Sequence, residues 1–235
     1  METTENFETE NASAEKKQKL RGIIITTIIT SIVCLIPCVI GLIIWNKLPD
    51  QIASHFNFNE VPDKVSSKEF VVFGFPCYFF ALNLLCNLLI YFSEKKGKTK
   101  SQPRVIYYIV GWLVPVVALV VSGIIYAYAL GIEVSIFKWL AFVLSVLFII
   151  MGNYIPKAEQ NRIIGFRTKS TLENPELWRK VNRFGGWVLV LGGIINLLLL
   201  FTPLAKYVFL ISLAIIALLP AIYLIILKQR MKKTD

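Results

Sequence analysis

Six long apolar runs constrain the fold of this chain more than any other feature. They cover about residues 22–46, 70–92, 105–130, 135–155, 184–203 and 207–227. Each run holds roughly 20 residues or more, and at ~1.5 Å of rise per residue such a helix crosses a ~30 Å hydrocarbon core. Inside a bilayer the backbone must satisfy its own hydrogen bonds, so each run is expected to be helical. The runs predict an all-α integral membrane protein with six transmembrane helices.

Composition argues against a soluble alternative. The chain is 56% hydrophobic, which exceeds the roughly 45–50% of an ordinary soluble domain. Buried core helices of a soluble protein would also be shorter than these runs. Five of the six runs contain no Asp, Glu, Lys or Arg. The fourth has Lys138 in its first turn, where the long side chain can reach the membrane interface.

The distribution of positive charge predicts the orientation. Twenty of the 25 Lys and Arg residues lie in the segment before the first run, in the second and fourth loops, and in the C-terminal tail. The other five are Lys47, Lys64, Lys68, Lys138 and Lys206. By the positive-inside rule, both termini are expected to be cytoplasmic and the first loop external. The net charge of +10 then faces anionic lipids rather than nucleic acid.

The composition divides the chain into four predicted parts. Residues 1–21 are acidic and polar and are expected to form a disordered cytoplasmic tail. Residues 22–92 form a two-helix membrane module. The charged, proline-containing segment 93–104 is predicted to be a cytoplasmic linker. Residues 105–235 form a four-helix membrane module.

The outer loop, residues 47–69, is longer than a tight hairpin needs, so it is expected to fold back on the membrane surface. It holds the only histidine of the chain, His55. Four roles remain open for this side chain: bracing the loop by hydrogen bonds, contacting a partner, sensing pH, or binding a metal, for which a single histidine is weak support. The candidates for partner contact are His55, Phe56, Asn57, Pro62 and Asp63.

The inner loop, residues 156–183, is polar and basic. A proline disfavours helix in the residue before it, so Pro156 is expected to end the fourth helix. Gly165 can adopt a left-handed turn. Asn174 followed by Pro175 is a helix start. The next residues predict a short amphipathic helix at the membrane surface that runs into the fifth span. The candidate residues here are Asn153, Pro156, Lys157, Asn161, Gly165, Arg167, Thr168, Trp178, Arg179, Lys180 and Arg183.

Two roles are possible for the basic side chains of the inner loop. They can contact lipid headgroups and fix orientation, or they can dock an acidic or phosphate-bearing partner. Arg167 is the best docking candidate, because a planar guanidinium binds two oxygens at once.

Within the spans, two patterns concern helix packing. The pairs Gly185/Gly186 and Gly192/Gly193 are seven residues apart and predict close approach of another helix. Asn83, Asn87 and Asn196 are expected to join helices by hydrogen bonds rather than to line a pathway. The four cysteines lie in apolar runs and read as small hydrophobes. The sequence contains no metal, phosphate-binding or catalytic motif, so no cofactor and no enzymatic activity are expected.

Both polar loops resemble a known family. The outer loop is similar to a short N-terminal domain of unknown function at Leu48, Pro49, Ile52, His55, Phe56, Asn57, Pro62, Asp63 and Lys68. The inner loop resembles the signature of the SdpI-type immunity proteins at Gly152, Asn153, Tyr154, Pro156, Lys157, Asn161, Gly165, Arg167, Thr168, Thr171, Leu172, Trp178, Arg179, Lys180, Arg183, Gly185 and Gly186. The chain departs from the usual proline, glycine and tryptophan at Ala53, Glu60 and Val65. It also replaces a usual Pro-Trp pair by Lys169-Ser170 and a Thr-His pair by Val181-Asn182.

The resemblance implies a multi-pass immunity protein of the bacterial cell membrane. Such a protein would give resistance to a secreted antimicrobial peptide toxin that it meets on its outer face. Some members of the family also signal by sequestering a transcriptional repressor at the membrane. Two alternatives stay open: a small-solute transporter or channel, and a membrane enzyme acting on lipid or cell wall.

Overall fold

The structure is a computed structural model that describes residues 2–96, 104–162 and 164–231. Its helices are α1 (Glu2–Ile43), α2 (Phe75–Lys96), α3 (Arg104–Ala129), α4 (Ile136–Tyr154), α5 (Lys169–Glu173), α6 (Pro175–Leu199) and α7 (Ala205–Met231). The short turns are η1 (Trp45–Lys47), η2 (Phe70–Gly74) and η3 (Ile155–Lys157). Within the described residues, six helices are long and apolar enough to cross a membrane. The predicted six-span, all-α membrane protein is therefore confirmed.

One short β-hairpin accompanies the helices. Strands β1 (Gln51–Phe56) and β2 (Pro62–Ser67) pair antiparallel in the segment between α1 and α2. The sequence predicted a loop folded back on the membrane surface here but did not predict strands.

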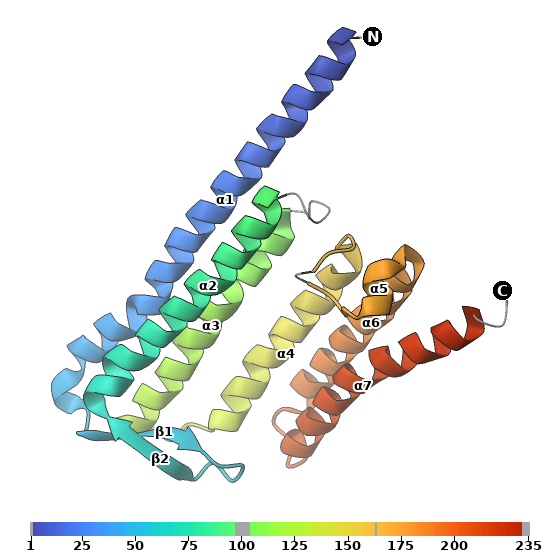
Figure 1. Cartoon of the computed structure of the whole chain (residues 1–235). Coiled ribbons are helices and arrows are strands. Elements are labelled where there is room, and N and C mark those ends of the chain that lie inside the picture. Colours follow the sequence, from blue (N-terminus) through green and yellow to red (C-terminus); the bar gives the residue numbers. More distant parts are fainter. Residues whose placement is uncertain (1, 97–103, 163, 232–235) are drawn as a thin grey trace.

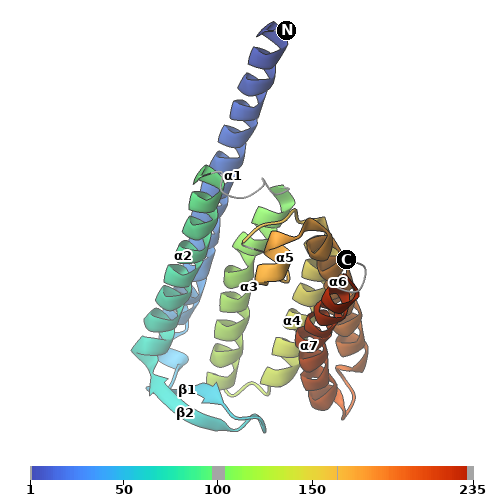
Figure 2. The ribbon, with the colours of Figure 1, turned by 45° about the vertical axis from the view of Figure 1, so that its right-hand side comes forward.

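The helices pack in two groups. α1, α2 and α3 lie against one another, whereas α4 packs along α6 and α6 along α7. The contact between α3 and α4 joins the groups (Figures 1 and 2). The division of the chain into the modules 22–92 and 105–235 stays a prediction. In the structure, α3 of the second module packs mainly against α1 and α2 of the first. Residues 97–103 of the predicted linker lie outside the described residues.

The polar segments lie at opposite ends of the bundle. The hairpin lies at one end, and the N-terminus of α1, α5 and the C-terminal end of α7 lie toward the other (Figure 1). This is the same separation that the charge distribution predicts. Which end faces the cytoplasm stays a prediction.

The N-terminal segment differs from its prediction. Residues 2–21, expected to be a disordered tail, continue α1 as helix. Glu, Ala and Lys favour helix, and extending an existing helix avoids the unfavourable nucleation step. Lys19 also pairs with Glu15 one turn earlier, at 3.3 Å.

The glycines of α6 bring neighbouring helices close. A Cβ added to Gly186 would lie 2.6 Å from the carbonyl oxygen of Gly152 on α4, and one added to Gly193 would lie 2.7 Å from the carbonyl oxygen of Ser145. Gly192 instead faces Ile216 of α7. Gly186 and Gly193, which are seven residues apart, therefore both allow close approach of α4, as their spacing predicts. Gly192 allows the contact with α7.

Two of the three asparagines that were predicted to join helices do so, Asn83 and Asn196. The Asn83 amide lies 3.1 Å from the hydroxyls of Thr30 and Ser31 on α1. Asn196 of α6 accepts a hydrogen bond from the Ser212 hydroxyl of α7 at 2.8 Å. All of these side chains are buried. This is the interhelical role that the sequence favoured over a pathway. The Asn87 amide differs, because it donates to the backbone and side-chain oxygens of Asn83 one turn earlier on the same helix, at 2.9 and 3.0 Å.

Candidate functional site

The hairpin of β1 and β2, which lies in the predicted outer loop and is called the outer hairpin below, is anchored at its base and irregular in its middle. Leu48 and Ile52 are buried against Val71, Val72 and Tyr126. Ala53 pairs with Val65, and the register shifts on both sides of His55. Such shifts bend the strands and re-aim side chains. The hairpin is therefore fixed to the helices at its base and projects the residues around His55.

His55 is hydrogen-bonded across the hairpin to Asp63. Its Nδ1 lies 2.5 Å from Oδ1 of Asp63. The His55 side chain is nevertheless 60% exposed, so it both braces the strands and remains accessible. No group of three or more side chains suited to a metal occurs among the residues that the structure describes.

The other outer candidates have local partners. The Phe56 ring packs edge-on against Tyr128 of α3, with centroids 4.9 Å apart. The Asn57 side chain accepts hydrogen bonds from the backbone N–H groups of Asn59 and Val61, at 2.9 and 3.1 Å. Pro62 pairs with Phe56. These residues shape the hairpin and its turn.

The hairpin also presents apolar side chains that the sequence reasoning missed. Phe58, Val61 and Val65 are exposed. They stand singly among polar residues, so neither a helical nor an alternating period marks them. Their exposure becomes visible only once the strand register is known.

Glu60 ties the hairpin turn to the other helix group. Its backbone has a φ of +63°, in the left-handed region where glycine is favoured, and the family resemblance places glycine here. Its carboxylate accepts a hydrogen bond from the Ser135 hydroxyl at 3.2 Å and lies 3.4 Å from the Lys206 ammonium. Lys206 also donates to the carbonyl of Phe58 at 3.0 Å. Glu60, with its backbone in the left-handed region, thus supplies a polar side-chain contact that glycine could not make.

The inner loop is held under the first turns of α6. The Trp178 indole donates to the carbonyl of Ala158 at 3.0 Å. The Asn182 side chain accepts from the backbone N–H of Phe166 at 2.7 Å and donates to the carbonyl of Trp178 at 3.0 Å. Gly165 has a φ of +109°, and a Cβ there would collide with Asn182. Asn182 stands where the family resemblance places histidine. Its amide is therefore the centre of the loop's packing.

Two further inner candidates have structural contacts. Asn161 is buried and accepts a hydrogen bond from the backbone N–H of Ile164 at 2.8 Å. Thr168 caps the N-terminus of α5 in a reciprocal arrangement with Thr171. Both therefore stabilise the loop backbone.

The basic candidates remain at the surface. Arg167 is exposed, and its guanidinium donates to the carbonyl of Arg162. Lys180 pairs with Glu176 one turn earlier, at 2.7 Å. Arg179 and Arg183 are exposed on α6. The loop therefore combines a hydrogen-bonded interior with a cationic surface.

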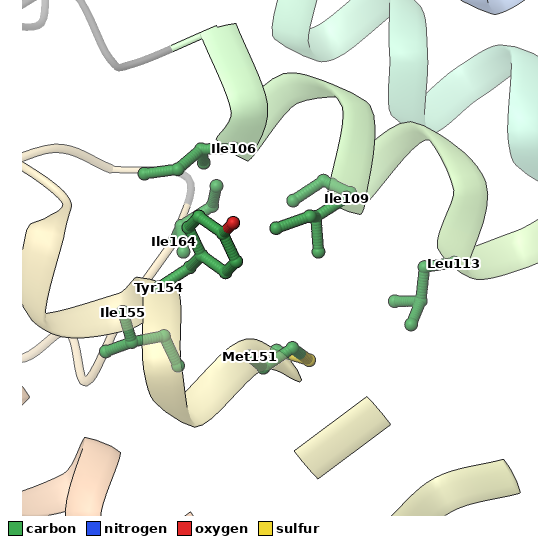
Figure 3. Close-up of a pocket in the computed structure, with 8 residues that line it drawn as sticks. Ile106, Ile109, Leu113, Met151, Tyr154, Ile155 and Ile164 are labelled. Carbon is green, nitrogen blue, oxygen red and sulfur yellow. The ribbon is translucent and has the colours of Figure 1, made fainter. Parts of the chain in front are cut away.

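Two clefts border this end of the bundle. One is apolar and lies between α3 and α4, where Ile106 and Ile109 face Tyr154 and Met151 (Figure 3). The other lies between α4 and α6 and is called the polar cleft below, because Asn153, Lys157 and Arg183 line it beside apolar residues. Its lining residues are Gly152, Asn153, Pro156, Lys157, Arg183, Gly186, Trp187 and Val190.

Comparison with known proteins matches both ends of the chain. The SdpI/YfhL protein family matches residues 157–227, and a domain of unknown function (DUF1648) matches residues 32–80. Immunity protein SdpI of Bacillus subtilis (strain 168) is 29% identical over 177 residues, which cover 75% of this chain and 82% of that protein. No solved structure matches.

Proposed function

Because the chain belongs to the SdpI-type family of bacterial multi-pass membrane immunity proteins, we propose that it protects its cell against a secreted antimicrobial peptide. The observation that carries this proposal is the extent of the similarity to an immunity protein. It covers 82% of that relative, and the two family matches include the hairpin and most of the inner loop. The proposal therefore rests on both polar ends of the molecule.

The outer hairpin is the proposed peptide-contact surface. A peptide that attacks a membrane must combine apolar and polar groups. The hairpin offers exposed apolar side chains, Phe58, Val61 and Val65, beside the accessible His55 and Asp63 pair. This combination supports contact with an amphipathic peptide arriving from outside.

The inner loop is the proposed signalling surface. In this reading, a transcriptional repressor docks on its exposed cations, with Arg167 as the first contact. The Arg167 guanidinium donates one hydrogen bond, to the Arg162 carbonyl. Its other N–H donors stay available for a carboxylate. Direct binding of nucleic acid is not part of the proposal.

The family points to a non-enzymatic role. A small-solute transporter or channel is the alternative that flux measurements in proteoliposomes address. A coupled transporter usually carries ionisable groups deep in its spans. Among the described residues, the one buried carboxylate is Glu94, which lies near the end of α2 and accepts a hydrogen bond from the Tyr107 hydroxyl. This placement favours the immunity role.

Expression in a peptide-sensitive bacterium tests the proposal. Cells that produce the full chain are challenged with a panel of secreted membrane-active peptides, and detergents serve as controls. We expect survival to rise for a specific peptide and to be unchanged for detergents. Equal protection against every membrane stress, or none against any peptide, would refute the proposed function.

A further inference from the structure

The polar cleft between α4 and α6 has the form of an anion site. It has a volume of about 290 Å³. Lys157 reaches it from η3 and Arg183 from α6, and Asn153 adds an amide from the last turn of α4. Two cations and one amide, from three elements, therefore border a single cavity.

Neither cation has an acidic partner among the residues that the structure describes. Within the part of the chain that the structure describes, Arg183 makes no ion pair, and the contact of Lys157 is with the Tyr154 ring at 4.6 Å. Lys180 and Lys206, by contrast, are paired with Glu176 and Glu60. Since like charges that share a cavity repel, an anion between Lys157 and Arg183 would stabilise the arrangement.

The backbone holds the cleft in place. Gly152 and Gly186 allow α4 and α6 to approach so closely that a Cβ on either would lie 2.6 Å from the other's carbonyl oxygen. A Cβ on Gly186 would also lie 2.5 Å from the Pro156 ring. The segments 152–157 and 183–186, at the two ends of the signature loop, therefore meet at this cleft.

One wall of the cleft continues onto an apolar helix face. Trp187 is 62% exposed. Leu191, Ile194 and Leu198 follow it on α6 at helical spacing, and all are exposed. In a membrane-spanning helix such a face contacts acyl chains. A ligand with a charged head and an apolar tail fits this geometry better than a soluble acidic protein does.

We propose that this cleft binds the phosphate group of an anionic phospholipid. The Arg183 guanidinium and the Lys157 ammonium bind the phosphate oxygens, and the Asn153 amide donates a further hydrogen bond. The Trp187 ring lies at the glycerol level, where tryptophan is favoured, and the acyl chains follow α6. A basic pocket between helices at the cytoplasmic side suits such a headgroup.

Native mass spectrometry of the full chain in mixed micelles tests the proposal. Phosphatidylglycerol and phosphatidylcholine are supplied together, and retained lipid is counted. We expect the wild type to retain phosphatidylglycerol preferentially. Lys157→Gln and Arg183→Gln should each weaken this retention at least about tenfold, the effect of losing one charge-assisted contact. Circular dichroism checks that the variants fold.

Arg179→Gln is the matched control, because Arg179 is exposed on the same helix but does not line the cleft. It should retain the lipid as the wild type does. Equal losses for Arg179→Gln and Arg183→Gln would overturn the proposal in favour of general charge attraction. Full retention by both cleft variants would overturn it in favour of an acidic protein partner. Displacement of the lipid by millimolar inorganic phosphate would overturn the lipid assignment and leave a free-phosphate site.

Discussion

Single residues of the inner loop divide into those that hold its backbone and those that face outward. Trp178 and Asn182 are buried and hydrogen-bonded to backbone groups. Arg167, Arg179 and Arg183 are exposed. A buried donor or acceptor that loses its partner costs about 1–3 kcal/mol. The first set therefore controls stability, and the second is available for binding.

Gly165→Ala is expected to destabilise the protein by at least about 1 kcal/mol. An L-residue in the left-handed region is strained, and the added Cβ collides with Asn182. Gly123→Ala is the control, because nothing lies within 4 Å of a Cβ there and alanine favours helix. Thermal unfolding in detergent, followed by tryptophan fluorescence, measures both. Equal melting temperatures for the two variants would contradict the loop geometry.

Glu60→Ala and Glu60→Gly separate backbone strain from the ion pair. Both remove the carboxylate that contacts Lys206 and Ser135, but only glycine relieves the positive φ. We expect the glycine variant to be more stable than the alanine variant by about 1 kcal/mol. The same unfolding assay applies. An alanine variant as stable as the glycine variant would show that the turn does not adopt this conformation.

At the scale of elements, the hairpin connects the two helix groups at its own end of the bundle. Its base is buried against α3, and its turn contacts Lys206 at the start of α7. Exposed ion pairs contribute little by themselves, about 0–1 kcal/mol. The buried base therefore fixes the position of the hairpin, and the polar contacts set the direction of its turn.

A disulfide tests the hairpin register. Directly opposed residues of antiparallel strands have Cα atoms ~4.5–5.5 Å apart, within the range of a disulfide. Ala53→Cys with Val65→Cys, in a variant without the native cysteines, should cross-link under mild oxidation, because these residues are partners. Ala53→Cys with Val61→Cys is out of register and should not. Non-reducing electrophoresis after a proteolytic cut in the turn reads the result, and cross-linking of the second pair alone would show a different register.

At the scale of the whole molecule, a bilayer makes much of the fold readable from sequence. Every span must bury its backbone polar groups in a helix, so the six apolar runs predicted the six long helices. The start of α6 at Asn174 and Pro175 was also predictable, because its capping residues act locally. Long-range packing was less accessible. The placement of α3 beside α1 and α2 depends on how side chains fit together, which the hydrophobic periodicity of the sequence does not reveal.

The candidate sites were only partly predictable for a related reason. The sequence marked the polar loops and their cations, but many candidates, including Asn57, Asn161 and Trp178, are occupied by local hydrogen bonds. The strands were missed because their alternation is weak and interrupted by register shifts. The polar cleft joins residues some 30 positions apart, which only the crossing of α4 and α6 brings together.

The orientation of the molecule is tested by labelling. Asn59→Cys in the exposed turn of the hairpin and Arg167→Cys in the inner loop are made in the cysteine-free variant. An impermeant thiol reagent added to intact cells should modify position 59 and should reach position 167 only after lysis, as the charge distribution predicts. Labelling of position 167 in intact cells would reverse the orientation.

Peptide contact at the outer hairpin is tested most directly by binding of the protective peptide to the full chain in lipid nanodiscs. His55→Ala and Phe58→Ala remove exposed groups of the hairpin and should each weaken binding about tenfold, or ~1.4 kcal/mol. Arg167→Ala, at the opposite end, should bind as the wild type does. Loss of binding in Arg167→Ala, with binding intact in His55→Ala and Phe58→Ala, would contradict the assignment of peptide contact to the outer end.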